Sequence, residues 1–224
     1  MSKRSRNVEG HDLILYDYWR SSAAYRVRIA LNLKGISFQS VPINLIKDGG
    51  RQHSPDYAAL NPNELVPLLV DGEITLNQSL TIIDYLDEHY AGPQLTPSKG
   101  KERYRVKALA QDIAIDIHPI NNLRVIQQLS QRFDIDEQDR VHWMQHWINT
   151  GFAALEKKLA PVSGIYCVGD EVSLVDVCLV PQVYNAQRFG VDMSAYPNID
   201  EIAGRLNELD AFQRAAPDNQ NDAT

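Results

Sequence analysis

The sequence predicts a two-part fold, in which a small α/β unit with a mixed sheet precedes an all-helical unit. Residues 12–91 alternate short apolar runs, which are typical of strands, with stretches that have helical spacing. Residues 91–97 then interrupt this pattern with one glycine and two prolines. Beyond them the apolar residues keep helical spacing and strand alternation does not return. We therefore place the boundary between the two units at residues 92–97.

The composition limits the classes of function. The 224 residues are 44% hydrophobic, which is enough for a substantial core. Asp and Glu number 29 against 22 Lys and Arg, and the net charge of -7 argues against a general nucleic-acid binder. The chain has no apolar run near the roughly 18 residues that a membrane helix needs. Residues 1–11 are basic and lack the apolar core of a signal peptide, so we expect a flexible tail on a cytoplasmic protein.

The two cysteines, Cys167 and Cys178, lie eleven residues apart in apolar surroundings. No cluster of Cys or His with the spacing of metal ligands accompanies them. We expect both to be buried thiols, with neither a disulfide nor a metal site.

The first half of the α/β unit has the pattern strand, helix, strand. Residues 13–19 are apolar and aromatic, as in a buried strand, and the helix that follows ends at Gly35. Residues 37–44 predict a second strand, which a βαβ connection makes parallel to the first. Because Pro42 has no N–H to donate, this second strand is expected at a sheet edge.

The second half of the α/β unit has the pattern strand, strand, helix. A short helix is expected around Tyr57, and Asp71 with Gly72 gives a strong hairpin signal between two short strands. Residues 79–90 have helical spacing and complete a βαβ-ββα unit over residues 12–91.

The all-helical unit is predicted to span residues 98–216. A long helix is expected at 99–133 with a kink at Pro119, and a second at 139–159. A third begins at Ser173 with a capping-box pattern and a fourth covers 199–215. The polar residues 217–224 are expected to be disordered.

The stretch of residues 20–31 combines two serines at a predicted helix start with three arginines and no acidic residue. A helix start exposes unpaired N–H groups and the positive end of the dipole, so this start can bind an anion, with Ser21 or Ser22 adding a hydroxyl donor. A thiolate held there would have its pKa lowered from the ordinary value of about 8.5. Since the stretch contains no cysteine, the thiol must come from a ligand. The alternative is that the serines only cap the helix and that Arg26 and Arg28 lie on a solvated face.

Two further features could serve a peptide-like ligand. A cis Val66-Pro67 bond would present a free strand edge that pairs with such a ligand. Gln78 and Ser79 lie at a second helix start, which suits a carboxylate.

Together these features resemble the glutathione transferase superfamily, and the motifs are similar to those of its zeta class. They include "SSAAYRVRIALNLKGI", "ALNPNELVPLLVDG", "NQSLTIIDYLDE" and "IYCVGDEVSLVDVCLVPQVYNAQRFGVD", and the similarity extends from about residue 13 to residue 216. The class usually has Ser-Ser-Cys in the first helix, whereas Ala23 occupies the third position here. The resemblance implies a glutathione-transferase fold, with a thioredoxin-like glutathione-binding domain and a helical substrate domain.

The resemblance also implies roles for particular residues. Ser22 donates to the glutathione thiolate with support from Ser21, while Gln52 and the main chain of Val66 hold the tripeptide backbone. The γ-glutamyl carboxylate is held by Gln78 and Ser79. The remaining implied residues are His118 and Asn122 near glutathione, and Arg20, Arg124 and Arg188 for a substrate carboxylate. His118 as a packed or surface residue, and Arg188 as a solvated charge at a helix end, are the alternatives.

The activity that the resemblance implies is an isomerisation with glutathione as coenzyme. Thiolate addition to maleylacetoacetate, bond rotation and elimination would convert this small dicarboxylate to fumarylacetoacetate in phenylalanine and tyrosine breakdown. Three alternatives remain: the same chemistry on maleylpyruvate, a broader transferase acting on electrophiles such as α-haloacids, and a binding module without turnover. The retained serines argue against the binding module. The resemblance further implies a homodimer.

Overall fold

The computed structural model describes residues 13–223, so the tail expected at residues 1–11 lies outside the described residues. The described chain forms two compact units. One holds residues 13–95 together with 209–223, and the other holds residues 96–208. The break after Leu95 falls within the segment that the prolines and glycine predicted as a linker.

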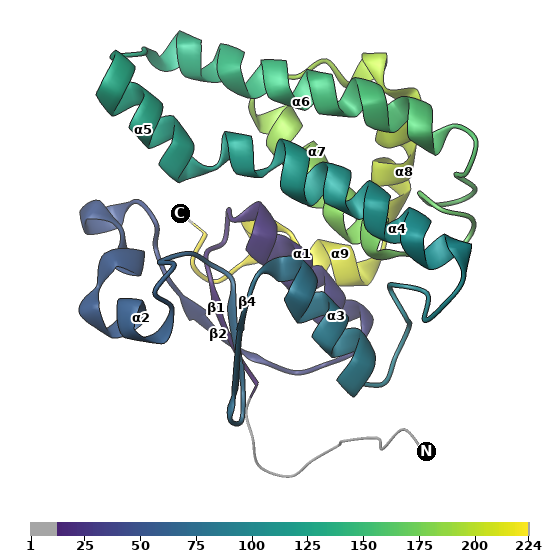
Figure 1. Ribbon diagram of the computed structural model, residues 1–224, viewed down its shortest axis with the longest axis horizontal. Helices are drawn as coiled ribbons and strands as arrows, with labels where there is room; N and C mark the ends of the chain where they lie inside the picture. The colour runs from purple at the N-terminus through teal and green to yellow at the C-terminus, as the bar shows by residue number, and fades with distance from the viewer. Residues whose placement is uncertain (1–12, 224) are drawn as a thin grey trace. The chain divides into compact units, whose positions relative to one another are not determined.

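Within the described residues, the first unit contains one four-stranded mixed sheet (Figure 1). Its strands are β1 (Ile14–Asp17), β2 (Gln39–Pro42), β3 (Leu68–Asp71) and β4 (Ile74–Asn77), in the order β2-β1-β3-β4. Strand β1 pairs in parallel with β2 and antiparallel with β3, and β3 pairs antiparallel with β4. The predicted βαβ unit, the edge position of the Pro42 strand and the hairpin are therefore confirmed.

Helices cover both faces of this sheet. They are α1 (Ser22–Leu33), α2 (Pro55–Leu60), α3 (Ser79–His89) and α9 (Asp210–Ala215). Figure 1 shows α2 on the opposite side of the sheet from α1 and α3. Helix α1 contacts both α3 and α9, so most of its surface is buried. The start of α1, which carries the two serines, is thus held on a rigid element.

The prediction that Arg26 and Arg28 lie on a solvated face is wrong, because each is only 1% exposed. Packing of α1 against α3 and α9 removes both side chains from water. The Nη1 atom of Arg28 donates to the Asp17 carboxylate at 2.7 and 2.8 Å. The Nη1 atom of Arg26 donates to Ser79 Oγ at 3.3 Å. Polar partners within the unit therefore replace solvent around the Arg28 guanidinium and at Nη1 of Arg26.

The second unit is all helical, as predicted. Its α-helices are α4 (Lys101–Gln111), α5 (Leu123–Phe133), α6 (Glu137–Leu159), α7 (Leu174–Arg188) and α8 (Pro197–Asn207). The predicted capping box at Ser173 is present: Ser173 Oγ accepts the Val175 N–H, and the Asp176 carboxylate accepts the Ser173 N–H at 2.7 Å. Burial raises the pKa of Asp176, while its hydrogen bonds from Cys167 and Ser173 oppose that shift.

The single helix predicted at 99–133 is divided into several pieces. Helix α4 leads into a π-helical turn, Asp112–Ile117, and a 3-10 turn, Pro119–Asn121, before α5 begins. In the π-helical turn the His118 N–H donates to the Ile113 carbonyl at 3.1 Å, and Pro119 has no N–H with which to continue the helix. The helix predicted at 199–215 is likewise two helices, α8 and α9.

Gly151 of α6 gives the π-helical turn the space it occupies. A Cβ atom at this position would overlap the Cγ1 and Cδ1 atoms of Ile117, the last residue of that turn. Ile117 is itself buried. The absence of a side chain at Gly151 therefore lets Ile117 approach the α6 backbone.

Replacing Gly151 with alanine is expected to lower the free energy of unfolding by about 1–3 kcal/mol, because the added methyl group overpacks the contact with Ile117. Gly204 of α8 is the matched control, since a Cβ there meets nothing within 4 Å. Gly204→Ala should instead raise the free energy of unfolding by up to about 1 kcal/mol through helix propensity. Urea unfolding of both variants measures the difference, and equal effects would contradict the contact.

The expectation of a disordered C-terminal tail is wrong for residues 217–223. They form a 3-10 turn, Pro217–Asn219, followed by ordered residues, and Pro217 is buried. The polar side chains bond to backbone carbonyls: Gln220 Nε2 donates to Arg214 at 2.9 Å and to Ala216 at 2.8 Å. Together with α9, this segment belongs to the first unit, so the helical unit ends at residue 208 and not at 216.

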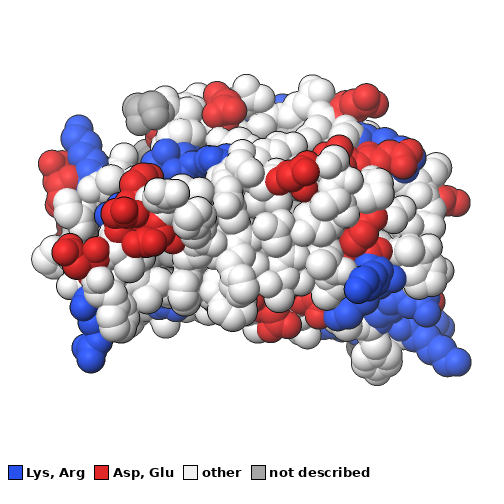
Figure 2. All heavy atoms as spheres, turned by 90° about the horizontal axis from the view of Figure 1, so that it is seen from above, with Lys and Arg blue, Asp and Glu red and all other residues white. Residues whose placement is uncertain are grey.

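The described part of the chain has no helix that is both long and apolar enough to cross a membrane. Figure 2 shows one face with charged side chains of both signs around a largely uncharged middle, so no patch of a single sign covers it. Cys167 and Cys178 are buried and form no disulfide. Burial raises the pKa of the Cys167 thiol, and the neighbouring Asp176 adds to this shift.

Candidate functional site

The start of α1 has the geometry of an anion site. Ser21 is the N-cap residue, and its Oγ accepts the Ala24 N–H at 3.2 Å. Ser22 is the first helical residue and is 8% exposed. Both serines therefore lie at the positive end of the α1 dipole, which favours a negative charge in front of the helix.

A tight turn leads into this helix start. The Ser21 N–H donates to the Tyr18 carbonyl at 2.8 Å, which places Trp19 and Arg20 at the centre of the turn. The guanidinium carbon of Arg20 lies 4.7 Å from the centre of a Trp19 ring, and its Nη2 donates to the Tyr18 hydroxyl at 3.3 Å. Arg20 is thereby held beside the two serines.

Gln52 presents a buried acceptor. Its Nε2 donates to the Leu45 carbonyl at 3.4 Å, whereas Oε1 is buried without a hydrogen-bond partner among residues 13–223. Gly50 has φ +99°, and a Cβ there would overlap the Gln52 side-chain amide. A buried unpaired acceptor in a closely fitted site suits an N–H donor from a ligand, as the peptide backbone of glutathione provides.

The Val66-Pro67 peptide bond is cis, as the sequence analysis anticipated. The segment before it is fixed by two donors to the Leu65 carbonyl, the Tyr57 hydroxyl at 2.6 Å and Asn61 Nδ2 at 2.7 Å. Burial raises the pKa of Tyr57 to about 12, so its hydroxyl remains a donor at neutral pH. The main chain around Val66 is therefore rigidly placed.

Gln78 and Ser79 lie at the start of α3. Gln78 is exposed and has φ +68°, a left-handed conformation that non-glycine residues rarely adopt. Ser79 is buried, and its Oγ accepts from Arg26 Nη1. This hydrogen bond links α1 to the start of α3, so the two helix starts of the candidate site are joined through Arg26.

The second unit carries the other predicted residues on two elements. His118 precedes the Pro119–Asn121 turn, and Asn122 Oδ1 caps α5 by accepting the Arg124 N–H at 3.2 Å. Trp143 Nε1 of α6 donates to the Ile120 carbonyl at 3.1 Å and holds this turn. Arg188 lies elsewhere, at the exposed end of α7, with its guanidinium carbon 5.0 Å from the centre of the Phe189 ring.

Sequence reasoning missed the roles of Arg26, Arg28 and Asp17 in supporting the α1 start. The available signal was that α1 is otherwise apolar from Ala24 to Leu31 and that Asp17 lies within the apolar and aromatic run of residues 13–19. Charged residues in such surroundings are seldom buried unless paired. No group of three or more His, Cys, Asp or Glu side chains among the described residues is arranged to hold a metal ion.

Two family models match the chain. Residues 15–94 match the glutathione S-transferase N-terminal domain, and residues 145–210 match the glutathione S-transferase C-terminal domain.

Curated relatives and solved structures of high similarity cover nearly the whole chain. A probable maleylacetoacetate isomerase from Vibrio cholerae is 59% identical over 94% of this chain and 98% of its own length. The maleylacetoacetate isomerase of Rattus norvegicus is 49% identical over 93% of this chain and 94% of its own. A holo structure of maleyl pyruvate isomerase, a bacterial zeta-class glutathione S-transferase, matches with TM-score 0.91 and 44% identity over 94% of this chain and all of that one. A Methylobacterium extorquens maleylacetoacetate isomerase with bound malonate and glutathione has TM-score 0.90 and 40% identity, covering 94% and 99% of the two chains. The chain therefore belongs to the zeta class of the glutathione S-transferase family.

Proposed function

We propose that the protein catalyses the glutathione-dependent cis–trans isomerisation of maleylacetoacetate to fumarylacetoacetate, a step of phenylalanine and tyrosine breakdown. The observation that carries the proposal is the α1 start, where Ser21 caps the helix and Ser22 occupies its first turn. The 59% identity to the Vibrio cholerae relative supports the choice of substrate.

The residues of the first unit fit glutathione. In this proposal Ser22, with Ser21 and the first-turn N–H groups, holds the thiolate and lowers its pKa. Gln52 offers its unpaired Oε1, and the Val66 main chain offers peptide groups, to the tripeptide backbone. Gln78 and Ser79 take the γ-glutamyl carboxylate at the α3 start. By family membership we also assign His118 and Asn122 of the second unit to glutathione.

Bound glutathione supplies a thiolate that adds reversibly to the cis double bond, which becomes a single bond that can rotate before elimination. The protein's part is to keep the thiol ionised at neutral pH, which the α1 dipole and Ser22 do. A second part is to hold the carboxylates of the substrate so that addition and elimination occur at one position, the role we assign to Arg20, Arg124 and Arg188. The negative charge that develops on the conjugated carbonyl during addition also requires a hydrogen-bond donor or an electrophile.

Replacing Arg188 with alanine is expected to raise the KM for a dicarboxylate about tenfold or more and to leave the KM for a neutral electrophile nearly unchanged, because only the dicarboxylate loses a charged partner. Arg132 of α5 is a matched control. It also ends a helix beside a phenylalanine, with its guanidinium carbon 5.9 Å from the Phe133 ring. Steady-state kinetics of both variants test the assignment, and equal changes on the two kinds of substrate would rule out a carboxylate role.

Maleylpyruvate is the second candidate substrate, because the structure of a maleyl pyruvate isomerase matches this chain with a TM-score of 0.91. Turnover of both acids, each with and without glutathione, tests the proposal. A requirement for glutathione supports the isomerase, and the ratio of kcat/KM values identifies the preferred acid. Glutathione binding without turnover of either acid would contradict the proposal and point to conjugation of electrophiles such as α-haloacids, or to a binding module.

We further propose that the protein is a cytoplasmic homodimer. Two buried cysteines without a disulfide support a reducing compartment. The dimer rests on membership of the glutathione S-transferase family, and sedimentation equilibrium of the full chain tests it. A mass of one chain across the concentration range would contradict the dimer.

A further inference from the structure

We propose that residues 220–223 are a positioning element of the glutathione site, with Asp222 holding the turn that precedes the two serines of α1. The inference rests on the proposed function, because it concerns the same thiolate site. It assigns a role to a segment whose composition alone predicts a disordered tail.

The segment is anchored on both sides of Asp222. Before it, the side chain of Gln220 donates to the carbonyls of Arg214 and Ala216 at the end of α9. After it, the Ala223 N–H donates to the Gln220 carbonyl at 3.1 Å, and Ala223 packs against the apolar cluster that contains Tyr18 and Trp19. These contacts fix the position of the Asp222 carboxylate.

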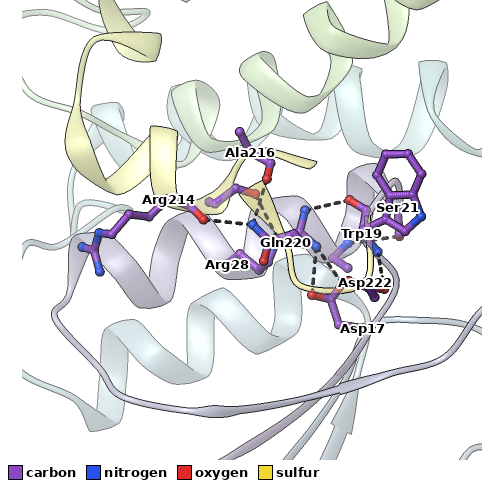
Figure 3. A network of polar contacts seen from close by, with 10 residues as sticks. Asp17, Trp19, Ser21, Arg28, Arg214, Ala216, Gln220 and Asp222 are labelled. Atoms are coloured by element: carbon purple, nitrogen blue, oxygen red, sulfur yellow. Dashed lines mark hydrogen bonds and ion pairs between the residues drawn. The ribbon is translucent and has the colours of Figure 1, made fainter. Parts of the chain in front are cut away.

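Asp222 and Arg28 hold Trp19 from opposite ends of its backbone (Figure 3). The Trp19 N–H donates to Asp222 Oδ2 at 3.3 Å, and the Trp19 carbonyl accepts from Arg28 Nη2 at 2.9 Å. Arg28 is in turn fixed by Asp17 and by the Ala215 carbonyl, which accepts from Nε at 2.9 Å. Both backbone polar groups of Trp19 are therefore satisfied by side chains, one of them contributed from 203 residues away.

The restraint on Trp19 passes directly to the helix start. Trp19 and Arg20 are the central residues of the turn closed by the Ser21 N–H and the Tyr18 carbonyl. Releasing the Trp19 N–H removes one of the restraints on that turn, and Ser21 and Ser22 follow it in the chain. The fraction of molecules with a correctly oriented helix start then falls, and the apparent affinity for glutathione falls with it.

The charge of Asp222 is unfavourable in this place, which leaves its hydrogen bond as the contact that favours it. Asp222 brings a second carboxylate toward Asp17. Asp17 is buried and already forms an ion pair with Arg28. A like charge in this place is unfavourable for both acids. The hydrogen bond from the Trp19 N–H is therefore the favourable contact that the carboxylate makes.

Three variants of the full chain test the proposal. Asp222→Ala removes the acceptor, and we expect the KM for glutathione to rise about three- to tenfold while kcat at saturating glutathione stays within about twofold, because saturation restores the oriented turn. Asp222→Asn keeps an amide oxygen that can accept the Trp19 N–H and should return the KM to within about twofold of wild type. Asp218→Ala is the matched control, because Asp218 is an exposed acid in the turn just before this segment, and it should change neither parameter.

A structural defect alone would lower kcat in proportion to the unfolded fraction and leave the KM unchanged, which would overturn the proposal. A rise in KM that the Asn variant does not reverse would also overturn it, since the hydrogen bond would then not be the cause.

Amide hydrogen exchange in the glutathione-free protein tests the contact separately from the proposed function. We expect the Trp19 amide to exchange at least about tenfold faster in Asp222→Ala than in wild type or Asp218→Ala, since its acceptor is lost. Unchanged exchange would overturn the proposal even if the kinetics differed. Failure of the wild-type protein to bind glutathione would refute the proposed function, and the exchange result would still decide whether Asp222 holds the turn.

Discussion

Replacing Ser22 with alanine is expected to lower kcat for glutathione-dependent isomerisation about 100-fold, because a donor aimed at the reacting charge is lost. The pKa of the bound glutathione thiol should rise toward the ordinary value of about 8.5, since the α1 dipole alone then stabilises the thiolate. Affinity for glutathione should fall much less, because the rest of the tripeptide keeps its partners.

Titration of the thiolate absorbance of bound glutathione measures the pKa directly. The neighbouring Ser21→Ala variant is the first comparison, since Ser21 caps α1 through Ala24. It should cost about 1 kcal/mol of stability and shift the thiol pKa less than Ser22→Ala does. Ser54→Ala removes the equivalent cap of α2 and should cost stability without any change in the thiol pKa.

An unchanged thiol titration in Ser22→Ala would remove Ser22 from the mechanism. A shift of the same size in Ser21→Ala and Ser22→Ala would instead mean that the geometry of the helix start, and not the second hydroxyl, controls the thiol.

The first unit was largely predictable because its signals are local. Apolar runs located the strands, the Asp71-Gly72 pair located the hairpin, and Ser79 marked the start of α3. The π-helical turn before His118 was not predictable, because it depends on the contact between Ile117 and Gly151, which are 34 positions apart. A proline signal at position 119 showed only that the helix is interrupted near that point.

In the candidate site, too, the features with local sequence signals were predictable and those that depend on tertiary contacts were not. The serines and the Gln78-Ser79 pair are adjacent in sequence, so their place at helix starts could be predicted. The left-handed conformation of Gln78 and the burial of Arg28 depend on tertiary packing, which periodicity does not report. The hydrogen bond from Trp19 to Asp222 joins residues at opposite ends of the chain, and the polar composition of the last residues suggested disorder.

Replacing Arg28 with methionine is expected to lower the free energy of unfolding by about 3–5 kcal/mol, because Asp17 is left as a buried carboxylate without its partner. The carbonyls of Trp19 and Ala215 also lose their donors. Arg105→Met is the matched control, since Arg105 forms an exposed pair with Glu102 and should cost less than about 1 kcal/mol. Urea unfolding at one protein concentration measures both variants.

The loss in Arg28→Met should depend on pH in a defined direction. Burial raises the pKa of Asp17 in the wild type, Arg28 opposes that shift and Asp222 adds to it, so removing Arg28 raises the pKa further. A carboxyl whose pKa is raised by folding binds its proton more tightly in the folded than in the unfolded state. The deficit should therefore be smallest at low pH, where Asp17 is protonated in both folded proteins. It should grow as the pH rises from the folded pKa of the wild type toward the higher folded pKa of Arg28→Met, and then level off.

The double variant Asp17→Asn with Arg28→Met separates the charge from the packing. Removing both members of the buried pair leaves no uncompensated carboxylate at position 17, so the double variant should be more stable at neutral pH than Arg28→Met alone. It should also lose the added pH dependence, because the titrating group is gone. A deficit in Arg28→Met that is the same at every pH, or one that the double variant does not reduce, would mean that lost packing and not the stranded carboxylate causes the instability.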